Sequence, residues 1–209
     1  MSAVWFTSDL HIGHESVATS RSCYGSTDLH DRILAEKWDA VVRPEDQVWV
    51  LGDVTLTGAE TVAYGLNWIS DRPGTKHLIA GNHDPCHPMH RDAHKWQPAY
   101  LQVFASVQAF ARRKIAGKNV LLSHFPYTGD HTETDRHTEY RLRDRNLPLL
   151  HGHTHSPNRL SRGRPRGLGI PGVIPWDGPL QIHVGVDAWN MAPVNLTEIE
   201  HLIAGDTNE

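Results

Sequence analysis

The stretch Gln47-Val48-Trp49-Val50-Leu51-Gly52-Asp53 decides the fold, because an apolar run of strand length stops there at a glycine and a carboxylate. Residues 3–7 form a second such run, which leads into Ser8-Asp9-Leu10-His11. Residues 76–80 form a third, which leads into Gly81-Asn82-His83-Asp84. We therefore predict three strands, over residues 3–7, 47–51 and 76–80, that each end at a polar cluster.

Apolar residues recur at helical spacing in both intervals between these strands. The first set runs from Leu29 to Val42 and follows Thr27 or Asp28, either of which suits a helix N-cap. The second set, Val62, Leu66 and Ile69, precedes the turn signal Pro73-Gly74. Strands that alternate with helices favour a parallel sheet.

The second half of the chain is richer in strands. Apolar runs over 101–110 and 119–122 flank a hairpin-like turn at 116–118, and shorter strands are predicted over 147–150 and 180–186. The segment Asn195-Leu196-Thr197-Glu198 resembles a capping box and predicts a final helix. Two long loops remain, a charged one over 127–145 and one over 157–179 that is rich in Gly, Pro and Arg.

Length and composition are those of one cytoplasmic domain over residues 1–209. The chain has 39% hydrophobic residues and a net charge of -4, so no global basic field attracts nucleic acid. Its first residues have no signal-peptide pattern, and no apolar run reaches the roughly 18 residues of a membrane helix. Cys23 and Cys86 match no CxxC spacing and are expected to be free thiols.

Metal-ligand residues follow the predicted strands. The chain has 16 histidines, but spacing is more informative than their number. Asp9 and His11 are two residues apart, as are His153 and His155, so on extended backbone each pair projects to one side. Ligands in open α/β sheets gather beyond the carboxyl ends of the strands. Carboxylates can bridge two divalent ions about 3.5–4 Å apart, and imidazole favours transition metals over Mg or Ca.

Five blocks together resemble the calcineurin-like metallophosphoesterases, in particular a small bacterial and phage branch that opens with Asp9-Leu10-His11-Ile12-Gly13-His14. The blocks are Asp9-x-His11, Gly52-Asp53, Gly81-Asn82-His83-Asp84, His124 and Gly152-His153-Thr154-His155. The resemblance implies an α/β sandwich of two mixed sheets flanked by helices. It also implies two divalent transition-metal ions, with manganese favoured over iron, zinc, cobalt or nickel.

The resemblance assigns a role to each block. One ion would be held by Asp9, His11 and His155, the other by Asn82, His124 and His153, and Asp53 would bridge them. A hydroxide shared by the ions would attack phosphorus. His83 would be the catalytic residue that protonates the leaving oxygen, and it would bind phosphate with Asn82. His14 would lie near the phosphate or, equally, be a loop histidine bonded to backbone.

The second block departs from the protein phosphatases of this family, which continue it as Gly-Asp-x-x-Asp-Arg-Gly. Leu56 stands in place of the second Asp, which leaves the partner that orients His83 unidentified. Thr57 stands in place of the Arg that holds a dianionic monoester. A diester carries one negative charge and needs less countercharge. We therefore expect a phosphodiesterase for small or cyclic nucleotides or general diesters.

Three alternatives remain open at this point. A phosphomonoesterase would bring in an arginine from a loop, and a nuclease would use the basic loop Arg159–Arg166 to guide nucleic acid. A solvated loop is the simpler interpretation of those arginines. A non-enzymatic scaffold with this fold would be expected to have lost ligands, whereas this chain has the whole set. Residues 184–189 resemble the family's closing strand and are interpreted as structural.

Overall fold

The computed structural model describes residues 2–23, 26–162 and 178–205. Its first sheet has the strand order β10-β1-β2-β3-β4. The first four strands along the chain run parallel to their neighbours and β10 is antiparallel to β1. Their bounds are β1 Val4–Thr7, β2 Gln47–Val50, β3 Thr75–Ile79, β4 Ser106–Gln108 and β10 Val194–Asn195. The three predicted strands are thus present with bounds shifted by about one residue.

The second sheet has the order β5-β6-β7-β9-β8. Strands β6, β7 and β9 are parallel, while β5 and β8 are antiparallel at the two edges. The predicted hairpin joins β5 to β6 through Ala116 and Gly117, which both have positive φ angles. The bounds are β5 Phe110–Ile115, β6 Lys118–Ser123, β7 Leu149–His151, β8 Leu160–Arg162 and β9 Leu180–His183.

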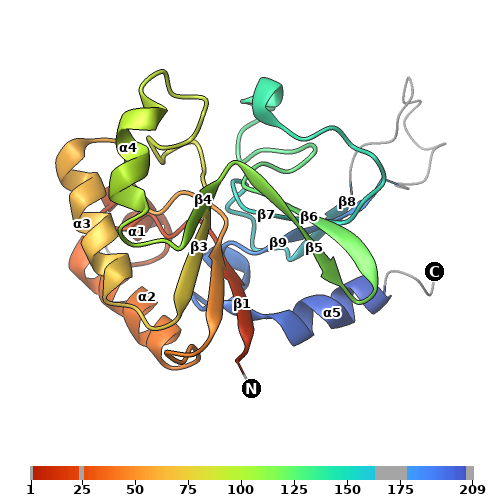
Figure 1. The fold of residues 1–209 in the computed structure, drawn as a ribbon, viewed down its shortest axis with the longest axis horizontal. Helices are drawn as coiled ribbons and strands as arrows, with labels where there is room; N and C mark the ends of the chain where they lie inside the picture. Colours follow the sequence, from red (N-terminus) through yellow and green to blue (C-terminus); the bar gives the residue numbers. More distant parts are fainter. Residues whose placement is uncertain (1, 24–25, 163–177, 206–209) are drawn as a thin grey trace.

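Figure 1 shows the helices flanking the two sheets, with α2, α3 and α4 on the outer side of the first sheet and α5 beside the hairpin. Two mixed sheets with flanking helices are the predicted α/β architecture. The bounds are α1 Glu15–Ser20, α2 Thr27–Asp39, α3 Ala59–Ser70, α4 Ala93–Tyr100 and α5 Leu196–Gly205, with 3-10 turns η1 Thr138–Tyr140 and η2 Val186–Ala188. No helix within the described ranges is long and apolar enough to cross a membrane.

Burial on both faces explains why the run from Val48 to Leu51, at and just beyond β2, has no polar residue. Val48 and Val50 pack in a cluster with α2 and α3, whereas Trp49 and Leu51 pack in a second cluster between the sheets. Successive side chains point to opposite faces of a strand, so a central strand of a covered sheet needs apolar residues at every position. The run that opened the sequence analysis is therefore buried on both sides.

Three local predictions were wrong. Residues 101–110 do not form one strand: a turn follows α4, and the remainder is divided between β4 and β5 in different sheets. The apolar residues there include Phe104, whose ring stacks on Tyr100 in the buried core. The cap of α2 is Ser26, whose Oγ accepts from Leu29 N at 3.2 Å, because the helix starts one residue earlier than expected. The last predicted strand stops at His183, and residues 186–188 form η2.

The predicted loop 157–179 lies partly outside the described residues, and its first part contains strand β8. The final helix begins as predicted, since Asn195 Oδ1 accepts from Thr197 N at 2.9 Å. The charged loop 127–145 has no strand and contains only the short turn η1.

Candidate metal centre

The predicted ligands lie beyond the carboxyl ends of five strands. Asp9, Asp53 and Asn82 follow β1, β2 and β3 of the first sheet, while His124 and His153 follow β6 and β7 of the second. Each of these strands is parallel to a neighbour within its sheet. The two sheets therefore bring their ligand-bearing ends together at one edge of the sandwich.

The backbone at these positions is not extended, which corrects the geometric reason given for the two-residue spacing. Five of the seven predicted ligands have φ between 47° and 70°, in the left-handed region: Asp9, His11, Asp53, His153 and His155. Non-glycine residues rarely adopt such angles, and they concentrate at functional sites where the surroundings enforce them. Tight turns, and not strand pleating, bring the paired residues to a common centre.

Asp9, His11 and His155 form the first half of the cluster, and their ligand atoms lie within 4.8 Å of one another. His11 Nε2 is 3.1 Å from His155 Nε2, and Asp9 Oδ1 is 3.9 Å from the same atom of His155. Asp9 also accepts from the backbone N of His153 at 3.0 and 3.1 Å, which ties the first ligand block to the last.

Asn82, His124 and His153 form the second half. Asn82 Oδ1 lies 3.0 Å from His124 Nε2 and 3.0 Å from His153 Nδ1. Asp53 lies between the halves, because its Oδ2 is 3.7 Å from His11 Nε2 and 3.4 Å from His124 Nε2. The structure thus brings the seven predicted ligands together, while their division between two ions stays a prediction.

Polar contacts on the far side of three histidines test whether the cluster fits metal ions. His124 Nδ1 lies 2.7 Å from the carbonyl of Leu51, and His153 Nε2 lies 3.0 Å from Asp130 Oδ2. Carbonyls and carboxylates only accept, so these outer nitrogens carry protons, and the inner nitrogens are left to face an ion once any proton on them is lost. His155 Nδ1 likewise faces a carboxylate oxygen, Asp187 Oδ2, at 3.5 Å. The donor set fits divalent transition metals.

Burial and neighbouring charges set the ionisation of the cluster. Burial holds the pKa of His11 well below its usual value and lowers the pKa of His153 to about 4, so both imidazoles are neutral ligands near pH 7. Burial opposes the charge on Asp53, but His124 and His11 outweigh it and the pKa of Asp53 falls far below its usual value. For His124, burial is likewise outweighed by Asp53, which raises the pKa of His124 to about 9.

Two glycines of the motifs are required by close approach. Gly52 has φ +90°, and a Cβ there would lie 2.5 Å from His124 Nδ1. A Cβ on Gly152 would lie 2.6 Å from Asp9 Oδ2. Both positions leave room only for a hydrogen atom beside a predicted ligand.

Asp84 holds the second and third blocks against each other. Its two carboxylate oxygens accept from the backbone N of Asp53, Val54 and Gly81 at 2.9, 3.1 and 2.8 Å. Burial, together with the charge of Asp53, raises the pKa of Asp84 to about 7. This residue was present in the quoted motif without a role, and the structure gives it one in positioning the backbone.

His83 and His14 lie beside the first half of the cluster. The His11 ring is 5.3 Å from the His83 ring and 5.5 Å from the His14 ring, both in edge-on contact. The backbone N of His83 donates to Asp53 Oδ1 at 2.9 Å. Within the described ranges, no hydrogen bond to the ring of His83 or of His14 is found. His83 therefore has no orienting partner there, and the His14 ring has no backbone partner.

Three residues that the sequence did not single out support the ligands. Asp130 faces His153, and Asp187 faces His155. Arg21 in turn donates to both oxygens of Asp187. Asp187 falls in the segment interpreted as a structural closing strand, so that interpretation was incomplete. No spacing signal marks such residues, because they act on ligands far away in the sequence.

The predicted basic loop is only partly described. Arg159 stacks on Trp189, with its guanidinium carbon 3.9 Å from the ring centroid, and donates to the carbonyl of Ala188. Arg162 donates to the carbonyl of Gly178 at 3.4 Å. Arg164 and Arg166 lie outside the described residues. Arg159 is thus an exposed loop residue, as the simpler interpretation expects, although its guanidinium contacts Trp189.

Proteins similar to this chain in sequence or fold include phage and bacterial proteins. A family model described as the calcineurin-like phosphoesterase superfamily domain matches residues 5–176. The gene 66 protein of Mycobacterium phage L5 is 49% identical over 97% of this chain and 95% of its own. That of phage D29 is 48% identical over 91% and 90%. The crystal structure of AQ665 from Aquifex aeolicus has a similar fold, with TM-score 0.66 and 21% identity over 97% of this chain and 100% of its own.

Proposed function

This chain belongs to the calcineurin-like phosphoesterase superfamily, and from that premise we propose that it is a two-metal phosphodiesterase. Its substrates would be small or cyclic nucleotides or general phosphodiesters. One observation supports the choice of diesters: within the described ranges, each arginine beside the ligand cluster is paired with a carboxylate. Arg21 is bonded to Asp187, and Arg136 to Asp130. With Thr57 at the position of the phosphatase arginine, this supports a substrate that carries a single negative charge.

The proposed ligands are those of the sequence prediction, with Asp53 between two triplets. Their mixture of nitrogen and oxygen atoms, without thiolate, supports manganese among the divalent transition metals. Such ions, when bound, would supply an activated water and stabilise the charge that develops on phosphate oxygens.

The residues of the chain itself would orient the substrate and move a proton. Asn82 turns its Oδ1 towards His124 and His153, which leaves its amide nitrogen to donate to a phosphate oxygen. His83 would give a proton to the leaving oxygen, since its ring borders His11 and is only partly buried. His14, on the other side of His11, would donate to a non-bridging oxygen.

A phosphomonoesterase is the second candidate, and Arg136 favours it. Its side chain is 40% exposed although it is paired with Asp130. A shift of this guanidinium towards a dianionic phosphate would supply the countercharge that Thr57 lacks. The nuclease alternative has less support, because Arg159 is stacked on Trp189 and the other arginines of that loop are described only in part.

The location and partners remain part of the proposal. Cys23 and Cys86 are free thiols and buried, which fits a reducing compartment such as the cytoplasm. The partner would be a small phosphodiester, with a nucleotide as the first class to test. Nucleic acid would be engaged only if the loop 159–166 contributes to the site.

Turnover of two chromogenic esters tests the proposal. The protein, stripped with EDTA and reloaded with Mn²⁺, would be assayed on bis(p-nitrophenyl) phosphate and on p-nitrophenyl phosphate. We expect a higher kcat/KM for the diester. Faster hydrolysis of the monoester would contradict the diester assignment and favour the role of Arg136. Cleavage of single-stranded oligonucleotides in parallel would show whether nucleic acid is a substrate.

A further inference from the structure

We propose that Asp130 is a positioning residue that sets the metal affinity of one half of the centre, the half formed by Asn82, His124 and His153. This inference rests on the proposed two-metal function. It goes further, because it makes one metal site depend on the loop 127–145 while the other depends on the core of the fold. Neither the motifs nor the family resemblance assigns Asp130 a role.

The His153 ring is held from both ends. Its Nδ1 lies 3.0 Å from Asn82 Oδ1, and its Nε2 lies 3.0 Å from Asp130 Oδ2. The side chains of His153 and Asp130 are 2% and 0% exposed, so solvent does not screen the contact. A carboxylate behind a ligand imidazole fixes its tautomer and raises its basicity, and its removal costs about 10–100-fold in metal affinity.

Asp130 is itself fixed by the loop that carries it. Arg136 donates to the carboxylate through Nε at 3.2 Å, Nη2 at 2.9 Å and its backbone N at 3.1 Å. The backbone N of His131 adds a bond of 2.7 Å. Arg141, which is 4% exposed, lies 3.7 Å away and bonds the carbonyls of Gly129 and Arg136. Residues of the same loop therefore fix the position of the Asp130 carboxylate.

The other half of the centre is supported differently. His155 Nδ1 is 3.5 Å from Asp187 Oδ2, beyond the 3.0 Å of the Asp130 contact. Asp187 is anchored by Arg21 at the end of α1 and not by the loop 127–145. The loop also touches this half through the His131 ring, which is 5.5 Å from the His155 ring. Because Asp187 and not Asp130 faces His155, a change at Asp130 should weaken binding of the ion at His153 and spare the other.

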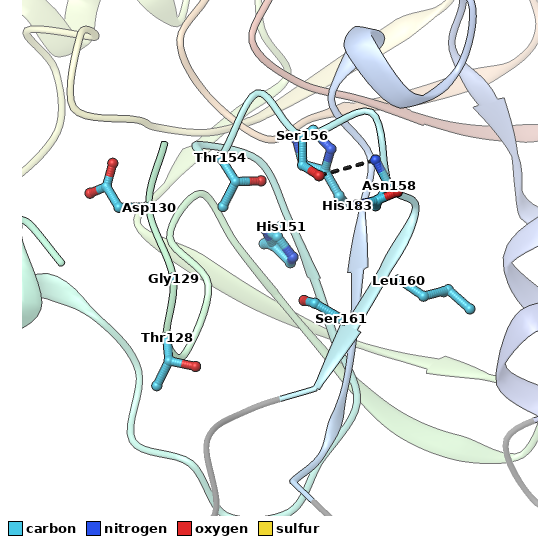
Figure 2. Close-up of a pocket in the computed structure, with 10 residues that line it drawn as sticks. All are labelled: Thr128, Gly129, Asp130, His151, Thr154, Ser156, Asn158, Leu160, Ser161 and His183. Carbon is cyan, nitrogen blue, oxygen red and sulfur yellow. Dashed lines mark hydrogen bonds between the residues drawn. The ribbon is translucent and has the colours of Figure 1, made fainter. Parts of the chain in front are cut away.

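A pocket lies between residues 128–130 of the loop and the ligand turn, residues 152–156, which carries His153 and His155. Figure 2 shows Thr128, Gly129 and Asp130 along one side of it, with Thr154 and Ser156 of the ligand turn across from them. The pocket has a volume of about 210 Å³. Beside this open space, the loop is joined to the ligand turn by the contact between Asp130 and the His153 ring and by that between His131 Nδ1 and the His153 carbonyl at 3.3 Å. Of the two, the Asp130 contact reaches the ligand ring nitrogen.

Metal titration of matched variants tests the inference. EDTA-stripped native protein, Asp130→Asn and Asp135→Asn would be titrated with Mn²⁺ by calorimetry. Asp135 is the control, because it accepts from Gly129 N within the same loop but contacts no predicted ligand. We expect two ions in the native protein and in Asp135→Asn. Asp130→Asn should keep one native affinity and lose about 10–100-fold in the other.

Two further measurements separate positioning from folding. The electron paramagnetic resonance of Mn²⁺ at two equivalents should change in Asp130→Asn from a spin-coupled pair to an isolated ion, while the metal-free melting temperature stays near the native value. Arg136→Gln, which removes two bonds to Asp130 from a partly exposed residue, should weaken the same site by a smaller factor.

The outcomes are distinguishable. Native affinity for both ions in Asp130→Asn, or an equal loss in Asp135→Asn, would overturn the role of Asp130. Fewer than two ions bound to the native protein would overturn both this role and the two-metal function. Two ions bound without diester turnover, together with a selective loss in Asp130→Asn, would support the role of Asp130 and contradict only the proposed substrate.

Discussion

Arg21 and Asp187 form a bidentate ion pair between segments 166 residues apart, with Nε–Oδ1 at 2.9 Å and Nη2–Oδ2 at 2.8 Å. The same guanidinium donates to the carbonyls of Asp9 and Leu10 at 2.7 and 3.3 Å. One arginine thus fixes the turn that carries the first predicted ligand and the carboxylate that faces His155.

Replacement of Arg21 should destabilise the protein even without metal. Arg21→Ala leaves a largely buried carboxylate unpaired, and we expect a loss of about 3 kcal/mol in the free energy of unfolding. Arg21→Lys keeps the positive charge but not the bidentate geometry of the guanidinium, so it should recover only part of the lost unfolding free energy. Urea denaturation in EDTA measures both. Arg91→Ala, at a side chain that is 94% exposed, is the control, and an equal effect there would contradict the prediction.

The strand ends could be predicted because their ligands are local features of the sequence. An apolar run that stops at Gly52 and Asp53 indicates at once the strand, the turn and the chemistry. The same holds at Gly81 and Asn82. The turn conformation could not be predicted, since left-handed φ angles at Asp9 and His11 are imposed by their contacts with other blocks.

Helices α1 and α4 escaped prediction for a physical reason. Only Ala18 is buried in α1, and only Ala93 and Tyr100 are buried in α4, so neither shows an apolar period. The carboxylates that support the ligands were not predicted for a different reason. Asp130 is 23 residues from His153, and no spacing rule links an outer carboxylate to its histidine.

Gly52→Ala should cost far more than a glycine replacement elsewhere. Gly52 and Gly117 both have positive φ, but a Cβ at Gly117 meets nothing within 4 Å, whereas at Gly52 it meets His124 Nδ1 at 2.5 Å. We expect Gly117→Ala to lose about 1 kcal/mol of unfolding free energy. Gly52→Ala should lose more and should also weaken Mn²⁺ binding. Similar losses in the two variants, measured by urea denaturation and calorimetry, would contradict a steric role for Gly52.

Asp46 should contribute to stability in a pH-dependent way. Its carboxylate accepts from Ala3 N at 2.7 Å, Arg43 N at 3.0 Å and Trp5 Nε1 at 3.0 Å. The bond from Ala3, with the others, lowers the pKa of Asp46 below its usual value. A lowered folded-state pKa stabilises the protein above the unfolded value of about 3.9 and loses that contribution as the pH falls.

Asp46→Asn should therefore reduce the unfolding free energy by about 1–3 kcal/mol at pH 7 and by less at pH 3. Urea denaturation at the two values, in EDTA, measures the difference. Asp92→Asn is the matched control, because Asp92 is 46% exposed and pairs with Lys95 at the surface. A difference from the native protein that stays constant with pH would show that ionisation of Asp46 is not the cause.

Asp53 and His83 should separate metal binding from turnover. Asp53 Oδ2 faces ligands of both halves, so Asp53→Asn removes the one charge that serves both ions and should reduce the bound Mn²⁺ from two to one or none. His83 is in neither predicted triplet, although its ligand atom lies within 4.8 Å of those of His11 and Asp53. His83→Ala should keep both affinities within about threefold and lower kcat by about 10²–10⁴-fold on a diester with a poor, alkoxide leaving group, as expected for a lost general acid. The loss of kcat should be smaller on bis(p-nitrophenyl) phosphate, because p-nitrophenolate leaves easily and needs little protonation. Equal metal loss in the two variants would make His83 a ligand. An equal fold-loss of kcat for good and poor leaving groups would show that His83 takes no part in proton transfer.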